Sequence, residues 1–266
     1  MNRIDSIFEH LKAEGKTALM PFLTAGYPSL GVTRQVIPTL KEAGASILEI
    51  GFPFSDPIAD GPVIAGSMHD ALMAGVTPRK IFTMISAIRS ETTLGLVAMV
   101  SQSIVFRSGN DQFIGQAADA GFDGLIIPDL DAEQAGAIAA TAQHHKLTLT
   151  LLVSQFSSPR RTRKLVEHCR GFIYLLARAG LTGEREEAPE IQDQVAALRK
   201  LTDLPIAAGF GISTAEHVQT VTRHADAAIV GSALVGRMGR AEDPVVEARK
   251  MVSELARGLS THPGNE

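Results

Sequence analysis

Short apolar runs alternate with longer amphipathic segments along most of the chain. Strands that are buried on both faces read as continuous apolar runs, which is typical of a parallel sheet covered by helices. Eight such runs occur: Ala18–Ala25, Ser46–Gly51, Leu96–Ser101, Gly124–Pro128, Thr148–Val153, Gly171–Leu176, Pro205–Ala208 and Ala227–Val230. The helix-length segments between them include Leu30–Ala43, Asp131–His144, Arg160–Cys169 and Glu190–Leu201. The alternation predicts eight βα units.

Two of these units have similar junctions between helix and strand. Ala43-Gly44 precedes one apolar run and Ala120-Gly121 precedes another, with glycine at the expected helix cap in both. Because an eightfold βα repeat closes into a barrel, we predict an α/β protein with a single (β/α)8 TIM barrel over residues 1–259. An extra N-terminal helix is expected over Met1–Lys12, and residues 260–266 are expected to form a disordered tail. A doubly wound sheet is the alternative, although it usually has fewer strands.

Composition narrows the class of protein. The formal charge of -4 argues against sequence-independent binding of nucleic acid, which needs clustered cations. The single cysteine, Cys169, excludes an internal disulfide and favours a reducing compartment, so we expect a cytoplasmic protein. No apolar run has the length of a membrane span, and the N-terminus does not read as a signal peptide.

Glu49 is the strongest single indication of chemistry. It lies within Ser46–Gly51, a run that should form a buried strand. Burial without a partner raises the pKa of a carboxyl, which suits a general acid or base working near neutral pH. The alternative is a structural glutamate in an ion pair, because such pairs also shift pKa values.

The segment 51–62 adds two more carboxyl groups, Asp56 and Asp60, among several prolines that restrict the backbone. It follows a predicted strand and therefore belongs to the carboxyl-terminal face of the barrel, where barrel enzymes build their active sites. The alternative is an ordinary turn, since proline, aspartate and glycine are turn residues.

Three glycine-centred segments follow the last three predicted strands: 180–183, 209–213 and 231–233. Barrels often bind phosphate with the loops after strands seven and eight and with a short helix N-terminus, where glycine lets the backbone approach the anion. We therefore expect a phosphorylated small molecule as ligand. No lysine ends a predicted strand, which disfavours a Schiff-base aldolase, and we expect no metal site.

Taken together, the segments 21–26 and 48–62 and the late glycine segments resemble the tryptophan synthase α subunit family, over nearly the whole chain. The resemblance implies a lyase of tryptophan biosynthesis that cleaves indole-3-glycerol phosphate into indole and glyceraldehyde 3-phosphate without a cofactor of its own. It implies that Glu49 protonates indole carbon 3 and that Asp60 stabilises positive charge at the indole nitrogen.

The resemblance also implies binding positions and a partner. The phosphate is expected near Gly183, Gly211, Gly231 and Ser232, and the indole ring near Phe22, Ile64, Tyr174, Thr182 and Phe210. A β subunit that carries pyridoxal phosphate is expected as partner in an α2β2 assembly, with Pro53, Asp56 and the loop after Gly180 near the contact.

Several positions depart from the family pattern. Ser101 and Ser103 replace a usual tyrosine and asparagine among the substrate-lining positions after the third strand, and Ser154, Ala177 and Asp131 replace other usual residues. Two alternatives therefore remain beside the lyase. One is an allosteric partner of the β subunit with weak or lost activity, and the other is a stand-alone lyase that releases indole.

Overall fold

The computed structural model describes residues 1–56, 60–154, 156–177, 189–209 and 211–259. In these segments nine parallel strands form one sheet in the order β5-β4-β3-β2-β1-β9-β8-β7-β6. The strands are β1 (Ala18–Thr24), β2 (Ile47–Gly51), β3 (Gly95–Met99), β4 (Gly124–Ile126), β5 (Thr148–Thr150), β6 (Leu152–Ser154), β7 (Ile173–Leu176), β8 (Ile206–Gly209) and β9 (Ala227–Val230). Each of the eight predicted runs overlaps one strand, except that the fifth overlaps two.

The short strands β5 and β6 at the ends of the sheet order are two parts of one run, separated only by Leu151. The first part pairs with β4 and the second part pairs with β7. The backbone amide of Tyr174 donates to the carbonyl of Leu151 itself at 3.3 Å. One chain segment thus joins both ends of the sheet, so the eight strand positions close into the predicted (β/α)8 barrel.

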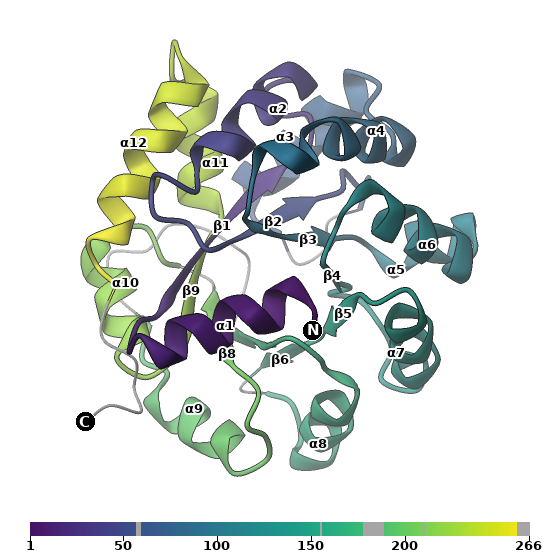
Figure 1. Cartoon of the computed structure of the whole chain (residues 1–266), viewed down its shortest axis with the longest axis vertical. Coiled ribbons are helices and arrows are strands. Elements are labelled where there is room, and N and C mark those ends of the chain that lie inside the picture. The colour runs from purple at the N-terminus through teal and green to yellow at the C-terminus, as the bar shows by residue number, and fades with distance from the viewer. Residues whose placement is uncertain (57–59, 155, 178–188, 210, 260–266) are drawn as a thin grey trace.

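Helices surround the strands as a ring (Figure 1). They are α2 (Leu30–Thr39), α3 (Pro62–Met73), α4 (Pro78–Ile88), the 3-10 turn η1 (Arg89–Glu91), α5 (Gln102–Ser108), α6 (Asn110–Ala120), α7 (Ala135–His144), α8 (Pro159–His168), α9 (Gln192–Arg199), α10 (Ala215–Thr222), α11 (Ser232–Arg240) and α12 (Pro244–Ala256). Their apolar faces pack on the outside of the sheet and form the larger core, which includes Ile50, Phe113 and Val252.

The predicted N-terminal helix is present as α1 (Arg3–Ala13) and lies across one mouth of the barrel (Figure 1). Ile4 and Phe8 are its buried residues, and they join the core inside the barrel with Met20 and Ile47. The rings of Phe8 and Phe172 have centroids 5.9 Å apart. Since α1 packs near the amino ends of the strands, the opposite mouth is the one left for a ligand.

Candidate active site

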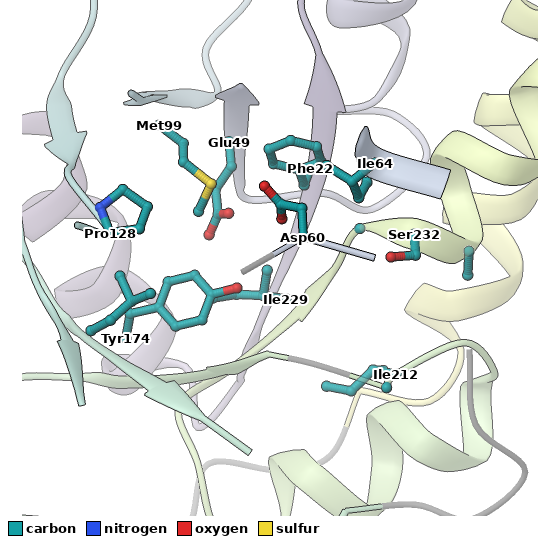
Figure 2. Close-up of a pocket in the computed structure, with 14 residues that line it drawn as sticks. Phe22, Glu49, Asp60, Ile64, Met99, Pro128, Tyr174, Ile212, Ile229 and Ser232 are labelled. Carbon is teal, nitrogen blue, oxygen red and sulfur yellow. The ribbon is translucent and has the colours of Figure 1, made fainter. Parts of the chain in front are cut away.

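A cavity lies at the carboxyl ends of the strands (Figure 2). Its lining is mostly apolar and contains two acidic residues and no Lys, Arg or His among the described residues. The lining residues are Phe22, Glu49, Asp60, Ile64, Met99, Pro128, Leu152, Tyr174, Gly211, Ile212, Ile229, Gly231, Ser232 and Ala233. Eight of the residues predicted from the sequence are therefore brought together, from elements up to 210 residues apart (232 − 22).

Strand register explains why these side chains meet. Every second residue of a strand points into the barrel, and parallel pairing aligns the inward positions of neighbouring strands. Phe22 of β1 pairs with Glu49 of β2, and Leu152 of β6 pairs with Tyr174 of β7. Inward side chains of β1, β2, β3, β6, β7 and β9 therefore line the cavity, above the closed core formed by earlier inward positions such as Met20 and Ile47.

Glu49 is the most unusual residue of the cavity. Its side chain is fully buried, and neither carboxyl oxygen has a hydrogen-bond partner among the residues that the structure describes. Burial raises the pKa of Glu49 well above its ordinary value, because no charge or hydrogen bond compensates the loss of water. The raised pKa favours the protonated acid, and the described residues provide no ion pair for Glu49.

Asp60 and Tyr174 face Glu49 across the cavity (Figure 2). Burial raises the pKa of Asp60 to about 6, so that most of its carboxyl is ionised at pH 7. The pKa of the Tyr174 phenol is raised well above its ordinary value, first by burial and then by the charges of Glu49 and Asp60. The cavity thus combines two carboxyl groups with raised pKa values and a phenol that stays protonated.

Two glycines make room for the aromatic walls. A Cβ atom on Gly51 would lie 2.4 Å from the Phe22 ring, and a Cβ atom on Gly209 would lie 2.5 Å from the Tyr174 hydroxyl oxygen. Contacts this short do not occur between packed atoms, so any side chain at either position would displace the ring. The sequence reasoning connected Gly209 with phosphate, but its direct contact is with Tyr174.

The other end of the cavity is formed by backbone. Gly231 is the N-cap of α11, no side chain caps this end of the helix, and Ser232 and Ala233 of its first turn line the cavity. A helix N-terminus attracts anions through its unpaired amide groups and its dipole. Gly211 lines the cavity nearby and has a φ of 80°, which favours glycine. An uncapped helix N-terminus and a glycine of this kind are the features that suit an anion.

Ser101 does not line the cavity. It is the N-cap of α5, and its hydroxyl donates to Asp129 Oδ2 at 2.7 Å and contacts Ser103 Oγ at 2.8 Å. The Gln102 amide donates to Asp129 Oδ1, also at 2.7 Å. Ser101 and Ser103, the departures from the family pattern that favoured the alternative of lost activity, therefore lie in a hydrogen-bonded junction. This junction connects the segments that follow β3 and β4.

The remaining predicted positions lie elsewhere. Asp56 is exposed and accepts a hydrogen bond from Ser55 at 3.0 Å, whereas Pro53 is buried, and neither lines the cavity. Thr182, Gly183, Phe210, the loop after Gly180 and the tail 260–266 lie outside the described residues.

Sequence reasoning missed six lining residues: Met99, Pro128, Leu152, Ile212, Ile229 and Ala233. Most are apolar residues within or next to apolar runs, so their residue type gave no indication of a site. Counting in steps of two from Glu49, with the strand register, would have found Met99 and Ile229 as the last inward positions of β3 and β9.

The described residues contain no group of three or more His, Cys, Asp or Glu arranged to hold a metal ion. None of the helices in the described segments combines the length and the apolar character that a bilayer crossing requires. The fold and the cavity define a barrel enzyme with two buried carboxyl groups beside an uncapped helix N-terminus.

Comparison with known proteins identifies the family. A family model of the tryptophan synthase alpha chain matches residues 8–262. The tryptophan synthase alpha chain of Synechococcus sp. (strain CC9902) is 42% identical over 252 residues, which cover 93% of this chain and 94% of that protein. That of Chloroflexus aggregans is 40% identical over 242 residues, covering 90% and 91%.

Solved structures agree with this result. The tryptophan synthase structure from Mycobacterium tuberculosis superposes with a TM-score of 0.89 at 33% identity, covering 97% of this chain and 98% of that chain. The alpha subunit from Legionella pneumophila gives the same TM-score, identity and coverage. The chain belongs to the tryptophan synthase alpha chain family.

Members of this family are lyases of tryptophan biosynthesis that cleave indole-3-glycerol phosphate, and this chain is a carbon–carbon lyase of that kind. The family result does not favour an allosteric partner that has lost its activity or a stand-alone enzyme.

Proposed function

We propose that Glu49 and Asp60 share the acid–base chemistry of indole-3-glycerol phosphate cleavage. Protonated Glu49 gives its proton to carbon 3 of the indole, which places a positive charge on the ring nitrogen. The bond from carbon 3 to the glycerol chain then breaks and its electron pair restores the aromatic ring. The hydroxyl of the leaving carbon loses its proton to the Glu49 carboxylate and becomes the aldehyde, so Glu49 is protonated again.

One observation carries this proposal: the fully buried Glu49 carboxyl has no hydrogen-bond partner on either oxygen in the described part of the chain. Burying a polar group without a partner costs several kcal/mol, so such a group is seldom retained for stability alone. An acid whose pKa is raised by burial and which meets only the cavity is suited to protonate a weakly basic carbon.

Asp60 has the complementary role in the proposal. Because its pKa is about 6, most of the group is a carboxylate at pH 7. A carboxylate beside the indole nitrogen stabilises the positive charge that develops there when carbon 3 is protonated. The absence of a cation from the described lining means that this carboxylate is not neutralised by the protein.

The phosphate is proposed to bind at Gly211, Gly231 and Ser232, where the uncapped N-terminus of α11 supports an anion. Gly183 belongs to the same proposal. The indole ring is proposed to lie against Phe22, Ile64 and Tyr174 in the apolar part of the cavity. Thr182 and Phe210 are further proposed ring contacts, and Ser101 stays a predicted substrate position without a cavity contact to support it.

The M. tuberculosis structure that this chain resembles is that of tryptophan synthase. The family's alpha chain carries no cofactor, since pyridoxal phosphate belongs to the beta chain. We propose that this chain likewise joins a β subunit in an α2β2 assembly. The exposed carboxylate of Asp56 and the nearby Pro53, on the segment that leads to Asp60, are proposed to lie near that contact. A cytoplasmic location is part of the same proposal.

The test compares Glu49→Gln with the wild type in indole release and in binding of glycerol 3-phosphate. The amide keeps the shape of the side chain and cannot exchange a proton, so indole release should fall at least ~1000-fold while phosphate-ligand binding stays within about twofold. Glu254→Gln, which removes a surface carboxylate paired with Arg237, is the matched control. Wild-type rates for Glu49→Gln would refute the proposed role.

A further inference from the structure

Two buried hydroxyl groups connect the wall of the cavity to the helix that follows Asp60. Thr24 Oγ1 at the end of β1 and Ser67 Oγ on α3 lie 2.6 Å apart. Each of these side chains is 2% exposed. Ser67 Oγ also lies 2.7 Å from the backbone carbonyl oxygen of Ile64, to which it donates.

The direction of both hydrogen bonds follows from the number of hydrogens. A carbonyl oxygen can only accept, and a serine hydroxyl has one hydrogen. Ser67 uses that hydrogen for Ile64, so the hydrogen between the two hydroxyls comes from Thr24. The result is a relay in which Thr24 donates to Ser67 and Ser67 donates to Ile64. Removing either hydroxyl breaks the connection between β1 and α3.

The relay connects β1 and α3, two elements that line the cavity. Thr24 is two residues after Phe22, so the two side chains lie on the same inward face of β1. Ile64 lines the cavity from the first turn of α3, and Asp60 precedes this helix by two residues. The N-cap of α3 is Gly61, which has no side chain to cap the helix. The relay therefore supplies a polar anchor close to the start of α3.

We propose that Thr24 and Ser67 are positioning residues for Asp60, and that their hydroxyl relay keeps the Asp60 carboxyl at the depth in the cavity that the cleavage reaction requires. The inference rests on the proposed role of Asp60. Neither hydroxyl lines the cavity, so the relay acts through α3 rather than on the substrate.

The relay has a measurable consequence for pH dependence. Burial holds the pKa of Asp60 at about 6, and the titratable groups that line the cavity with it in the described part of the chain are Glu49 on β2 and Tyr174 on β7. Loosening α3 admits water to Asp60 and lowers its pKa toward the ordinary value of 3.8. In the plot of kcat against pH, the acid limb, where kcat falls as pH decreases, should then move to lower pH. A loss of stability alone would not cause this shift.

The primary test uses Ser67→Ala, because alanine has a higher helix propensity than serine and keeps α3 intact. We expect kcat to fall by about 10-fold to 100-fold, as for a small displacement of a catalytic group, with KM within about twofold. The acid limb should move below pH 6. Thr24→Val, which has the same shape without the hydroxyl, should give the same changes, and Thr24→Ser should restore the wild-type profile.

Thr222→Val is the matched control. The Thr222 hydroxyl is also buried and donates to a backbone carbonyl, that of Val218 at 2.9 Å, but it lies on α10 away from the cavity. This variant should retain the wild-type kcat and acid limb. The double variant Thr24→Val/Ser67→Ala should lose no more activity than either single variant, because both changes break one relay.

Different results would overturn the proposed relay and the proposed role of Asp60 in cleavage. If Ser67→Ala and Thr24→Val keep the acid limb at the wild-type pH with kcat within about twofold, the relay does not position Asp60. If Asp60→Asn retains wild-type turnover, the proposed function of Asp60 fails first, whatever the relay variants do. A loss of kcat that Thr24→Ser does not restore would also overturn the relay.

Discussion

The hydroxyl oxygen of Tyr174 lies 2.5 Å from the point that a Cβ atom on Gly209 would occupy. Gly209 ends β8, and Tyr174 lies on the neighbouring strand β7, where the register pairs it with Ala207. The phenol therefore occupies the space above a residue without a side chain. This arrangement lets a bulky ring line the cavity beside two carboxyl groups.

A single methyl group at this point should reduce activity. Gly209→Ala is expected to displace the Tyr174 ring and to lower kcat/KM by about 10-fold to 100-fold, because displacements near 1 Å at an active site have effects of that size. Tyr174→Phe in the same chain removes the atom that clashes at 2.5 Å, although ring carbons remain 3.0 Å away. Steady-state kinetics should show partial recovery in the double variant. Equal activities of Gly209→Ala and the wild type would contradict the packing argument.

Glu49 should make the stability of the protein depend on pH. The folded state keeps the Glu49 proton above pH 4.5, whereas the unfolded chain releases it, so the free energy of unfolding falls as pH rises toward the raised pKa. Glutamine has no proton that titrates in this range, so Glu49→Gln removes this pH-dependent fall in the free energy of unfolding. The variant should therefore gain stability relative to the wild type by about 1.4 kcal/mol per pH unit above pH 4.5, measured by urea unfolding.

The matched comparison is Asp60→Asn. The same sign applies to Asp60, whose pKa rises from 3.8 to about 6, so its relative gain should accumulate between these values and stop near pH 6. The gain of Glu49→Gln should continue to higher pH. A stability difference between Glu49→Gln and the wild type that does not change with pH would show that the buried carboxyl does not retain its proton.

The proposed phosphate site can be tested separately from the acids. Gly211 has a φ of 80° and lines the cavity near the N-terminus of α11. Gly211→Val adds a branched side chain to a backbone conformation that disfavours it, so the affinity for glycerol 3-phosphate should fall by about tenfold or more. Calorimetry measures this directly. Unchanged affinity would exclude Gly211 from the proposed phosphate site.

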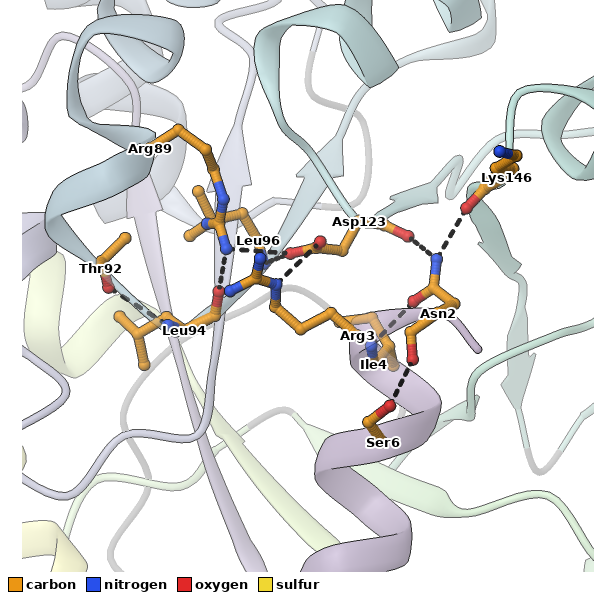
Figure 3. Close-up of polar contacts among 10 residues, drawn as sticks. All are labelled: Asn2, Arg3, Ile4, Ser6, Arg89, Thr92, Leu94, Leu96, Asp123 and Lys146. Atoms are coloured by element: carbon orange, nitrogen blue, oxygen red, sulfur yellow. Dashed lines mark hydrogen bonds and ion pairs between the residues drawn. The ribbon is translucent and has the colours of Figure 1, made fainter.

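Asn2 should contribute to stability without contributing to catalysis (Figure 3). Its side-chain oxygen accepts from the Ile4 amide at 2.8 Å and caps α1, while its side-chain nitrogen donates to the carbonyls of Asp123 and Lys146, each at 2.8 Å. Asn2→Ala should lower the free energy of unfolding by about 1 to 3 kcal/mol, through the lost cap and unpaired carbonyls. The kcat of the folded variant should equal that of the wild type, since the cavity is at the other mouth of the barrel. A fall in kcat would contradict this separation.

The barrel could be predicted because its strands are buried on both faces and read as continuous apolar runs. The division of the fifth run into β5 and β6 at Leu151 could not be predicted. It arises because the first part of this run pairs with β4 and the second part pairs with β7. The segment expected as a helix to Ala43 ends instead at Thr39, just after Pro38, whose ring removes a backbone donor. Boundaries of this kind depend on local geometry more than on periodicity.

The carboxyl groups of the site were predictable because Glu49 is a polar residue in an apolar run. Met99 and Pro128 were not, because they are apolar residues among apolar residues and only the strand register places them in the cavity. Ser101 was expected at the substrate from resemblance, whereas its hydroxyl bonds Asp129, 28 residues away in the chain. A contact of that sequence separation cannot be read from a local pattern.

The most direct test of the account follows the proton itself. Indole and glyceraldehyde 3-phosphate are incubated in D2O with the wild type or with Glu49→Gln, and loss of the proton signal at indole carbon 3 is followed by NMR. The reverse reaction removes that proton and the forward reaction returns deuterium, so the wild type should exchange it rapidly. Glu49→Gln should exchange it no faster than the solution without enzyme. Exchange by Glu49→Gln at the wild-type rate would show that another group moves the proton.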